Sequence, residues 1–406
     1  MTRHGWHGPV RSARLLATIL ALVVLGAACS SDDDGPNVDG NGTGDGGEVA
    51  PMTIGLLTDL SGPVATFGTD IQAASELAVE EINADGGVNG SMLELQVVDT
   101  GLDPGEAVQG LRDLATEQNA FAVSGPVSSG EAEVIFAQAP DLQIPVMTAT
   151  ANQPGLTELG EGWAFVNTPT AVHAYAQALP AFALNYQVSR VALVYDDESP
   201  GPTATAELVV PAVAEQAGIE IVDTATFQVG ATDFAGLVER VAAEDVDALF
   251  FMSLPVEAGL FAREMQNQGL DLPVLGFAAQ GSGAFREAGG DAIHDWVIPT
   301  VFFPPASDAA SEFAAKMQEA DPEPPTVPEA ANAYEIIYMI AQVAEDAGID
   351  GGTPVEEARE AIRDGLLGLS GFEGPTGPVS FMENGEAEKT VYTLVLTGAE
   401  ETELLE

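Results

Sequence analysis

Basic residues and cysteine are scarce in this sequence. It has 12 Lys and Arg against 63 Asp and Glu, a formal net charge of −51, and a single cysteine, Cys29. One thiol excludes an intrachain disulfide and any metal site built from several cysteines. So acidic a surface repels nucleic acids and anionic membranes, and it also suits a protein that stays soluble in high salt.

Motifs of several common enzyme classes are also missing. No G-x-G-x-x-G follows the first predicted strand, and neither a phosphate-binding G-x-x-x-x-G-K-[ST] nor a G-x-S-x-G nucleophile elbow occurs. His173 and His294 are isolated, and the other two of the four histidines lie near the start of the chain. We therefore expect no catalytic residue, no cofactor and no metal site. A secreted α/β hydrolase is the less favoured alternative.

The first 28 residues have the pattern of a secretory signal peptide. A basic segment precedes an apolar run, residues 15–28, that ends in small residues. A helix that spans a bilayer needs about 20 apolar residues, so this run is short for that purpose. The run leads into L-G-A-A-C, which resembles a bacterial lipobox, although Leu25 lies one residue further from Cys29 than usual. We predict removal of residues 1–28 and lipidation of Cys29; the alternative is an ordinary secreted protein.

Residues 29–50 form the predicted linker. After Cys29 the segment SSDDDGPNVDGNGTGDGGEVA is acidic and almost devoid of apolar side chains, so it cannot bury enough surface to fold. A flexible tether of about 20 residues reaches roughly 25 Å. Anchor, tether and globular body together predict an extracytoplasmic protein on the outer face of the cell membrane, which contacts the membrane only through its lipid.

From residue 51 onward, short apolar runs alternate with stretches of helical spacing. This alternation is typical of parallel sheets that are covered by helices on both faces. The strands fall into two series of about four, with no long linker between them, which predicts two similar α/β lobes. The predicted strands are 52–57, 93–98, 120–124, 144–148, 190–196, 219–227, 247–253 and 272–277. Helices are predicted from residue 68 and at 104–118, 203–217, 233–243, 257–268, 307–320, 329–347 and 355–367.

Three strand ends in the first series lead into turns rich in Gly, Ser, Thr and Asn. They are TDLSGPVATFG at 58–68, GPVSSG at 125–130 and TATANQPG at 148–155. Ligands of open parallel sheets bind beyond the carboxyl ends of the strands. Ser128 alone is better explained as an N-cap of the next helix. The three turns together predict a site for an anion or carboxylate, held by N–H groups at a helix N-terminus.

Several of these segments resemble the branched-chain amino acid type of periplasmic solute-binding protein. The strongest similarity lies in IGLLTDLSGPVATFG at 54–68, in the A-x-E-x-I-N-A-D-G-G-V-N-G pattern at 78–90 and in GFEGPTGPVSFMENG at 371–385. SGPVSS, TATANQPGLT and DFAGLV match further family segments. The likeness covers most of residues 51–398 and is looser in the second series.

The resemblance implies the type I periplasmic binding protein fold: two doubly wound parallel-sheet lobes joined by a three-segment hinge. Lobe 1 would comprise residues 51–170 with 303–377, and lobe 2 residues 171–302 with 378–406. Such proteins close on a small ligand by hinge motion. In this family the closed form delivers the ligand to the permease of an ABC transporter.

The resemblance also assigns ligand-binding residues in lobe 1. Ser129, with Ser128 beside it, stands where the family binds the ligand carboxylate through a hydroxyl and an N–H. Thr150 stands where a backbone carbonyl meets the ligand ammonium. Asn152 replaces a Thr that binds the carboxylate, and Phe67 stands where an aromatic residue lines the pocket.

Lobe 2 departs from the family pattern. Pro200 and Leu254 stand at or beside positions where Tyr is frequent, and Ala278 stands where the acidic partner of the ammonium is expected. Because a buried ammonium without a counter-charge is costly, Glu198 or Gln280 is a candidate to replace it. The ligand is therefore an amino acid, or a related carboxylic acid or amide that lacks the amine.

The resemblance predicts a non-enzymatic, lipid-anchored solute-binding component of an ABC importer that binds a small polar ligand between its lobes. A ligand-sensing receptor module is the first alternative, because the same fold serves both roles. An adhesion or scaffold module without a small ligand is another.

Overall fold

Two parallel sheets with the same strand order organise the chain. The structure, a computed structural model, describes residues 49–320, 328–398 and 401–405. Residues 48–406 form one compact unit. The predicted signal peptide, the predicted lipidation site Cys29 and nearly all of the predicted linker lie outside the described residues. No helix among the described residues is long and apolar enough to cross a membrane.

Lobe 1 is built on a five-stranded, entirely parallel sheet in the order β2-β1-β3-β4-β5. Its strands are β1 (Met52–Thr58), β2 (Leu93–Asp99), β3 (Ala122–Ser124), β4 (Val146–Thr148) and β5 (Ala164–Val166). A small antiparallel sheet of β11 (Phe372–Gly374), β12 (Gly377–Phe381) and β13 (Ala387–Glu388) belongs to the same lobe. The order 2-1-3-4-5 places the switch point of the sheet between β1 and β3.

Lobe 2 repeats this order in its parallel part, β7-β6-β8-β9-β10, and adds β14 and β15 antiparallel at the β10 edge. The strands are β6 (Arg190–Asp196), β7 (Glu220–Phe227), β8 (Ala248–Met252), β9 (Val274–Gly276), β10 (Trp296–Thr300), β14 (Tyr392–Leu396) and β15 (Thr402–Leu404). Two parallel sheets of the same order confirm the predicted fold class.

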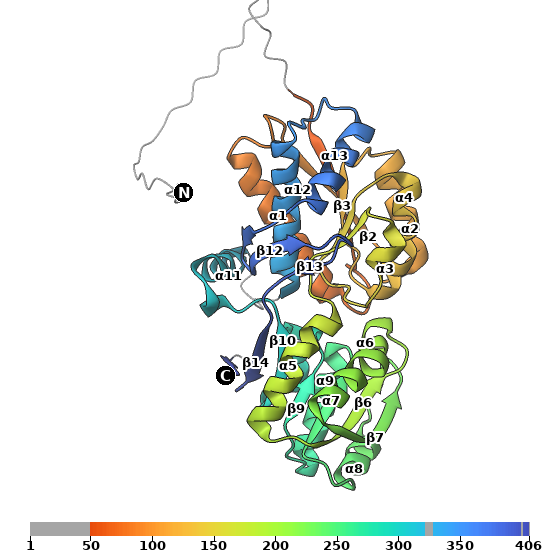
Figure 1. The fold of residues 1–406 in the computed structure, drawn as a ribbon, viewed down its shortest axis with the longest axis vertical. Coiled ribbons are helices and arrows are strands. Elements are labelled where there is room, and N and C mark those ends of the chain that lie inside the picture. The colour runs from red at the N-terminus through yellow and green to blue at the C-terminus, as the bar shows by residue number, and fades with distance from the viewer. Residues whose placement is uncertain (1–48, 321–327, 399–400, 406) are drawn as a thin grey trace, which may run out of the picture. The chain divides into compact units, whose positions relative to one another are not determined.

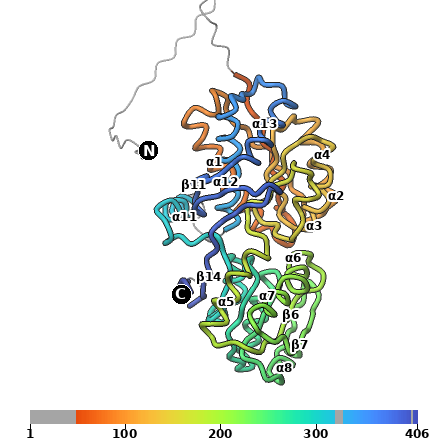
Figure 2. The backbone as a smooth tube through the Cα atoms, in the orientation of Figure 1, coloured from red at the N-terminus to blue at the C-terminus, as the bar shows by residue number. Residues whose placement is uncertain are grey.

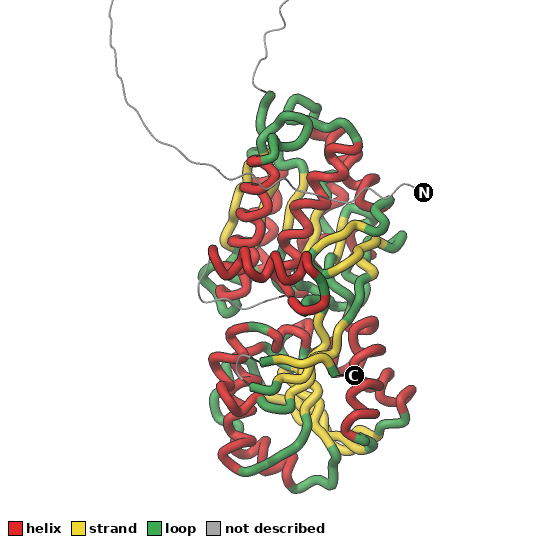
Figure 3. Tube along the Cα trace, turned by 90° about the vertical axis from the view of Figure 1, so that its left-hand side faces the viewer, coloured by secondary structure: helices red, strands yellow, loops and turns green. Residues whose placement is uncertain are grey.

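Helices cover the sheets of both lobes (Figure 3). In lobe 1 they are α1 (Ala65–Ala84), α2 (Pro104–Thr116), α3 (Ser129–Phe136), α4 (Ala139–Leu142), α11 (Asp308–Ala320), α12 (Pro328–Asp346) and α13 (Val355–Leu367). In lobe 2 they are α5 (Ala171–Tyr186), α6 (Pro200–Ala204), α7 (Val210–Ala217), α8 (Ala235–Ala242), α9 (Pro255–Gln268) and α10 (Gly283–Gly289). The 20-residue α1 packs along α12, although more than 200 residues separate them in the sequence (Figure 1).

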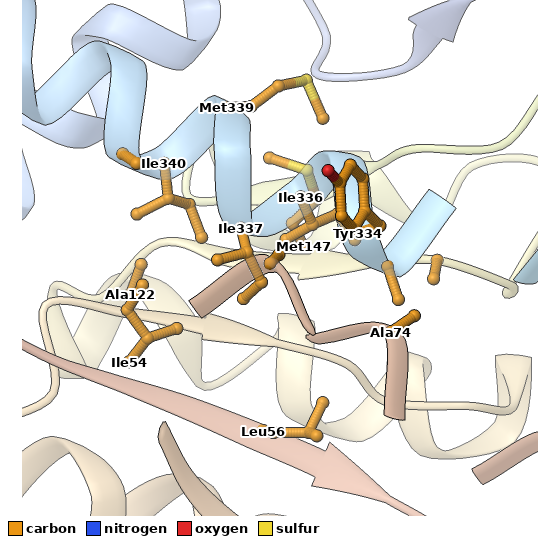
Figure 4. Packing of buried hydrophobic residues seen from close by; sticks show 14 of the residues in the cluster. Ile54, Leu56, Ala74, Ala122, Met147, Tyr334, Ile336, Ile337, Met339 and Ile340 are labelled. Atoms are coloured by element: carbon orange, nitrogen blue, oxygen red, sulfur yellow. The ribbon is translucent and has the colours of Figure 1, made fainter. Parts of the chain in front are cut away.

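Each sheet is buried on both faces. In lobe 1, strand residues such as Ile54 and Met147 meet Ile336, Ile337 and Ile340 of α12 on one face (Figure 4). Leu57 and Val123 pack against α2 and α3 on the other face. Burial on both faces explains why these strands appear in the sequence as continuous apolar runs rather than as alternating patterns.

The described chain crosses between the lobes three times (Figure 2). The crossings follow β5, β10 and β13. The third differs from the expected boundary at residue 377, because Val379, Phe381 and Ala387 still pack in the core of lobe 1. After the third crossing, the chain re-enters lobe 2 at β14. The small sheet of β11 to β13 is therefore part of lobe 1.

Candidate functional site

A cavity of about 380 Å³ lies where the carboxyl ends of the two sheets face each other. The residues that line it include those that follow β1, β3, β4 and β5 in lobe 1, and those that follow β6, β7, β8, β9 and β10 in lobe 2. This is the edge at which open parallel sheets bind ligands. The volume falls in the range of sites for small molecules, about 300–1,000 Å³.

The turn after β1 is held by Asp59, whose side chain is fully buried. Its carboxylate accepts hydrogen bonds from the N–H groups of Gly62 (2.5 Å) and Val64 (2.9 Å). Gly68 packs so tightly that an added Cβ would lie 1.7 Å from the Asp59 carbonyl oxygen. Asp59 therefore shapes the backbone of this turn, and the segment presents apolar residues to the cavity, among them Pro63, Val64 and the aromatic Phe67.

The adjacent serines at the start of α3 differ in role. Ser128 is the N-cap: its hydroxyl donates to Glu131 Oε2 (2.7 Å) and accepts from the Glu131 N–H (3.2 Å). Ser129 lies in the cavity wall, is 6% exposed, and its hydroxyl has no hydrogen-bond partner among the described residues. Ser128 also borders the cavity, but its hydroxyl hydrogen is already engaged. The hydroxyl left for a ligand is that of Ser129.

The turn after β4 provides two further predicted residues. The Thr150 hydroxyl donates to the Val127 carbonyl oxygen, so the side chain is engaged in joining two turns. Asn152 lines the cavity, is 8% exposed, and its side-chain amide has no partner within the described chain. An amide that borders the cavity without a protein partner is available to hydrogen-bond a ligand there.

Gly201 of lobe 2 lies opposite these residues. A Cβ added there would lie 3.6 Å from Ser129 Oγ, 3.8 Å from Asn152 Oδ1 and 3.7 Å from the ring of Phe277. A Cβ added to Gly130 of lobe 1 would similarly lie 3.4 Å from the ring of Pro200. The polar part of lobe 1 thus faces lobe 2 at short range, and both lobes enclose the same space.

The wall from lobe 2 is mainly apolar. Its apolar members are Ala174, Pro200, Pro202, Val229, Leu254, Phe277, Ala278, Ala279, Pro299, Val301 and Val391. Ala278, the position at which the resemblance expects an acidic residue, is one of them. Apart from Glu198, lobe 2 therefore supplies mainly apolar surface to the cavity.

The two residues proposed to replace that charge lie in different settings. Glu198 is exposed at the cavity wall and already accepts hydrogen bonds from the Gln228 amide (3.2 Å) and the Val229 N–H (3.1 Å). Gln280 is fully buried and not in the wall. Its side chain accepts from the Phe277 N–H and donates to the Ser253 carbonyl, so it holds the turn after β9 and is not a ligand contact.

Glu329 is a wall residue that the sequence analysis missed. It lies in the first turn of α12, is 7% exposed, and its Oε2 is buried without a hydrogen-bond partner. Burial raises the pKa of its carboxyl group to about 8, and the nearby charge of Asp70 adds to this rise. With 63 acidic residues in the chain, no local pattern singles this one out.

Two turns further along α12, a buried ion pair joins the elements behind the cavity. Lys389 Nζ lies 2.6 Å from Glu335 Oε2 and 2.6 Å from Asn332 Oδ1, and both charged side chains are fully buried. The Asn332 amide in turn donates to the Ala149 carbonyl oxygen (2.9 Å), beside Thr150. The pair therefore connects the third crossing segment to α12 and to a turn of the site.

The fold and the cavity agree with comparisons to known proteins. A family described as periplasmic binding protein matches residues 51–400, and the chain belongs to this family. The Leu/Ile/Val-binding protein of Rhizobium johnstonii is 28% identical over 85% of this chain and 91% of its own length. A leucine-, isoleucine-, valine-, threonine- and alanine-binding protein of Pseudomonas aeruginosa is 27% identical over 84% and 89%. Family and relatives are binding proteins, not enzymes, as predicted.

Solved structures show the same fold. The branched-chain amino acid transporter substrate-binding protein LivJ of Streptococcus pneumoniae, in complex with isoleucine, superimposes with a TM-score of 0.78 at 26% identity, covering 87% of this chain and 99% of its own. The leucine-binding protein LivK of Thermotoga maritima has a TM-score of 0.78 at 21% identity, with 87% and 97% covered. The likeness confirms the predicted type I periplasmic binding protein fold.

Proposed function

We propose that this chain is the solute-binding component of an ABC importer and binds a small amino acid or related carboxylate in the cavity between its lobes. Lipidation at Cys29 would hold it on the outer face of the membrane, and a permease would receive the ligand. The relatives from Rhizobium and Pseudomonas are named for binding small neutral amino acids, which supports this ligand class.

One observation carries the proposal. Ser129 and Asn152 are more than nine-tenths buried, border the same cavity, and have no hydrogen-bond partner for their side chains among the described residues. Small-molecule sites are mostly apolar and carry a few polar groups that are free to orient the ligand. A ligand oxygen between the two side chains would form hydrogen bonds with both of them. The N–H groups at the start of α3 would also donate to it, and the helix dipole favours negative charge there.

Apolar residues complete the binding mode. Phe67 of lobe 1 and Phe277 and Leu254 of lobe 2 line the same cavity. These side chains offer a surface for the apolar part of a ligand, as in most small-molecule sites. Closure of the lobes would remove that part from water, so ligand binding would favour the closed form.

Ser129→Ala tests the assignment. Loss of a hydroxyl that binds a charged ligand group should weaken binding by about 1–3 kcal/mol, or roughly 5–150-fold. Calorimetry with L-isoleucine and L-leucine on the body from residue 51 would measure this. Glu215→Gln, an exposed change on α7, is the matched control. Unchanged affinity in the Ser129 variant would remove this residue from the site.

A further inference from the structure

The charges in the cavity wall are all of one sign. The wall contains two acidic residues, Glu198 and Glu329, and among the described residues no Lys, Arg or His contributes to it. A ligand that carries only a negative charge would meet no cation there. A ligand that also carries a positive group would match the wall better, because an opposite charge offsets the cost of burial.

Of the two acids, only Glu329 has a buried oxygen without a hydrogen-bond partner among the described residues. The oxygens of Glu198 hold the turn after β7 and lie in an exposed side chain. Glu329 is buried, and Oε2 has no partner. A buried carboxyl with an unsatisfied oxygen destabilises the empty protein, which is the arrangement expected when a ligand supplies the missing partner.

From this geometry we propose that Glu329 is the counter-charge for an amine nitrogen of the ligand, so the ligand is an amine-bearing carboxylic acid. The inference rests on the proposed function. Lobe 1 would then bind both charged ends, the carboxylate through Ser129 and the amine through Glu329. Lobe 2, with Ala278 at the position where an acid was expected, would cover the ligand with apolar surface.

Glu329 must be ionised to pair with an ammonium group. Burial and the charge of Asp70 on α1 raise the pKa of Glu329, and its own backbone N–H lowers it. The other wall acid is Glu198, and further along α12 Glu335 is already paired with Lys389. In the empty protein the pKa of Glu329 is about 8, so at pH 7 binding releases a proton and ionises the carboxyl. Affinity for an amine-bearing ligand should therefore rise up to about tenfold per pH unit between pH 6 and 8.

The experiment compares paired ligands on the wild type and on Glu329→Gln, which preserves shape and removes the charge. The first pair of probes is L-leucine and its amine-free counterpart 4-methylpentanoic acid. The second pair is 6-aminohexanoic acid, whose amine lies further from the carboxylate, and hexanoic acid. Calorimetry at pH 6, 7 and 8 in two buffers of different ionisation enthalpy measures affinity and proton release together.

We expect the wild type to prefer an amine-bearing probe over its partner and to release a proton at pH 7. Glu329→Gln should lose at least tenfold affinity for that probe and should release no proton, whereas Glu215→Gln should behave as the wild type. Glu329→Asp, a second variant that keeps the charge, should retain part of the preference for the amine.

Three outcomes overturn the inference while the proposed function stands: equal affinity of Glu329→Gln for the amine-bearing probe, a wild-type preference for the amine-free acids, or loss of the preference in Glu198→Gln instead. If the wild type binds none of the probes, nor other amino acids or carboxylates, the proposed function fails and the inference fails with it.

Discussion

Two buried glutamates on α12, six residues apart, lie in contrasting environments. Glu335 pairs with Lys389 at 2.6 Å and accepts hydrogen bonds from the N–H and hydroxyl of Thr376 at 2.7 Å each. Glu329 borders the cavity, and its Oε2 has no hydrogen-bond partner among the described residues. The first carboxylate is satisfied by the protein itself, whereas the second keeps an unsatisfied oxygen. Burial alone therefore does not distinguish a structural acid from a functional one; the partners do.

The largest effect is expected from breaking the satisfied pair. Lys389→Met leaves Glu335 as a buried charge without its counter-ion, which should lower the free energy of unfolding by about 3–5 kcal/mol. Urea denaturation measures the change. Combining Lys389→Met with Glu335→Leu should recover part of the loss, because the unpaired buried charge is gone, although the two Thr376 donors then lack their acceptor. A single variant that loses less than about 1 kcal/mol would contradict the assigned role.

The opposite effect on stability is expected at Glu329, where removing the ionisable group should stabilise the protein. Below pH 4.5 Glu329 is protonated in the folded and unfolded states alike, and between 4.5 and its folded pKa of about 8 only the unfolded chain readily ionises. Wild-type stability should fall with rising pH in this window. Glu329→Gln cannot ionise and so does not lose stability in this way. Its free energy of unfolding should therefore exceed that of the wild type by roughly 2–4 kcal/mol at pH 8.

The measurement is urea denaturation of both proteins at pH 5, 6, 7 and 8 without ligand. Burial also raises the pKa of Asp196, to about 6, but that residue is present in both proteins and cancels in the difference. A difference that does not grow with pH would show that Glu329 already has a partner. Both glutamates would then be satisfied by the protein itself, and the contrast drawn between Glu335 and Glu329 would be wrong.

The smallest effect concerns a single hydrogen bond at the satisfied acid. Thr376→Val removes the hydroxyl that donates to Glu335 Oε1 but keeps the N–H bond to the same oxygen. We expect a loss of about 1–2 kcal/mol in urea denaturation, because the acceptor is charged. Thr69→Val on the exposed side of α1 is the control and should stay within about 0.5 kcal/mol. Equal effects at both sites would mean that the charge network adds nothing.

The strand ends in lobe 1 show how far local sequence patterns reach. The turns after β1, β3 and β4 were predicted from small polar residues, and all three border the cavity. Which side chains face it did not follow from composition. Asp59 and Ser128 are engaged in shaping their own turns, whereas Phe67 and Ser129, next to similar residues, are presented to the cavity.

Some short strands were not predicted, although the three-residue strands β3, β4 and β9 were. β5 and β10 were not among the predicted strands, and the small sheet of β11 to β13 was expected to lie partly in lobe 2. Two- to five-residue strands carry little periodicity, and their pairing depends on partners far away in the sequence. The sheet belongs to lobe 1 because Val379 and Phe381 find an apolar surface there.

By itself the sequence determined the alternation of strands and helices, the two similar lobes and the polar turns, because each depends on neighbouring residues and on hydrophobic periodicity. Only the tertiary structure decided which polar groups remain without partners. Glu329, Glu335 and Gln280 are all buried acids or amides. Glu335 and Gln280 find hydrogen-bond partners at residues tens of positions away in the sequence, whereas Glu329 Oε2 finds none among the described residues. Hydrogen-bond satisfaction is a property of three-dimensional neighbours, so no local pattern in the sequence could reveal it.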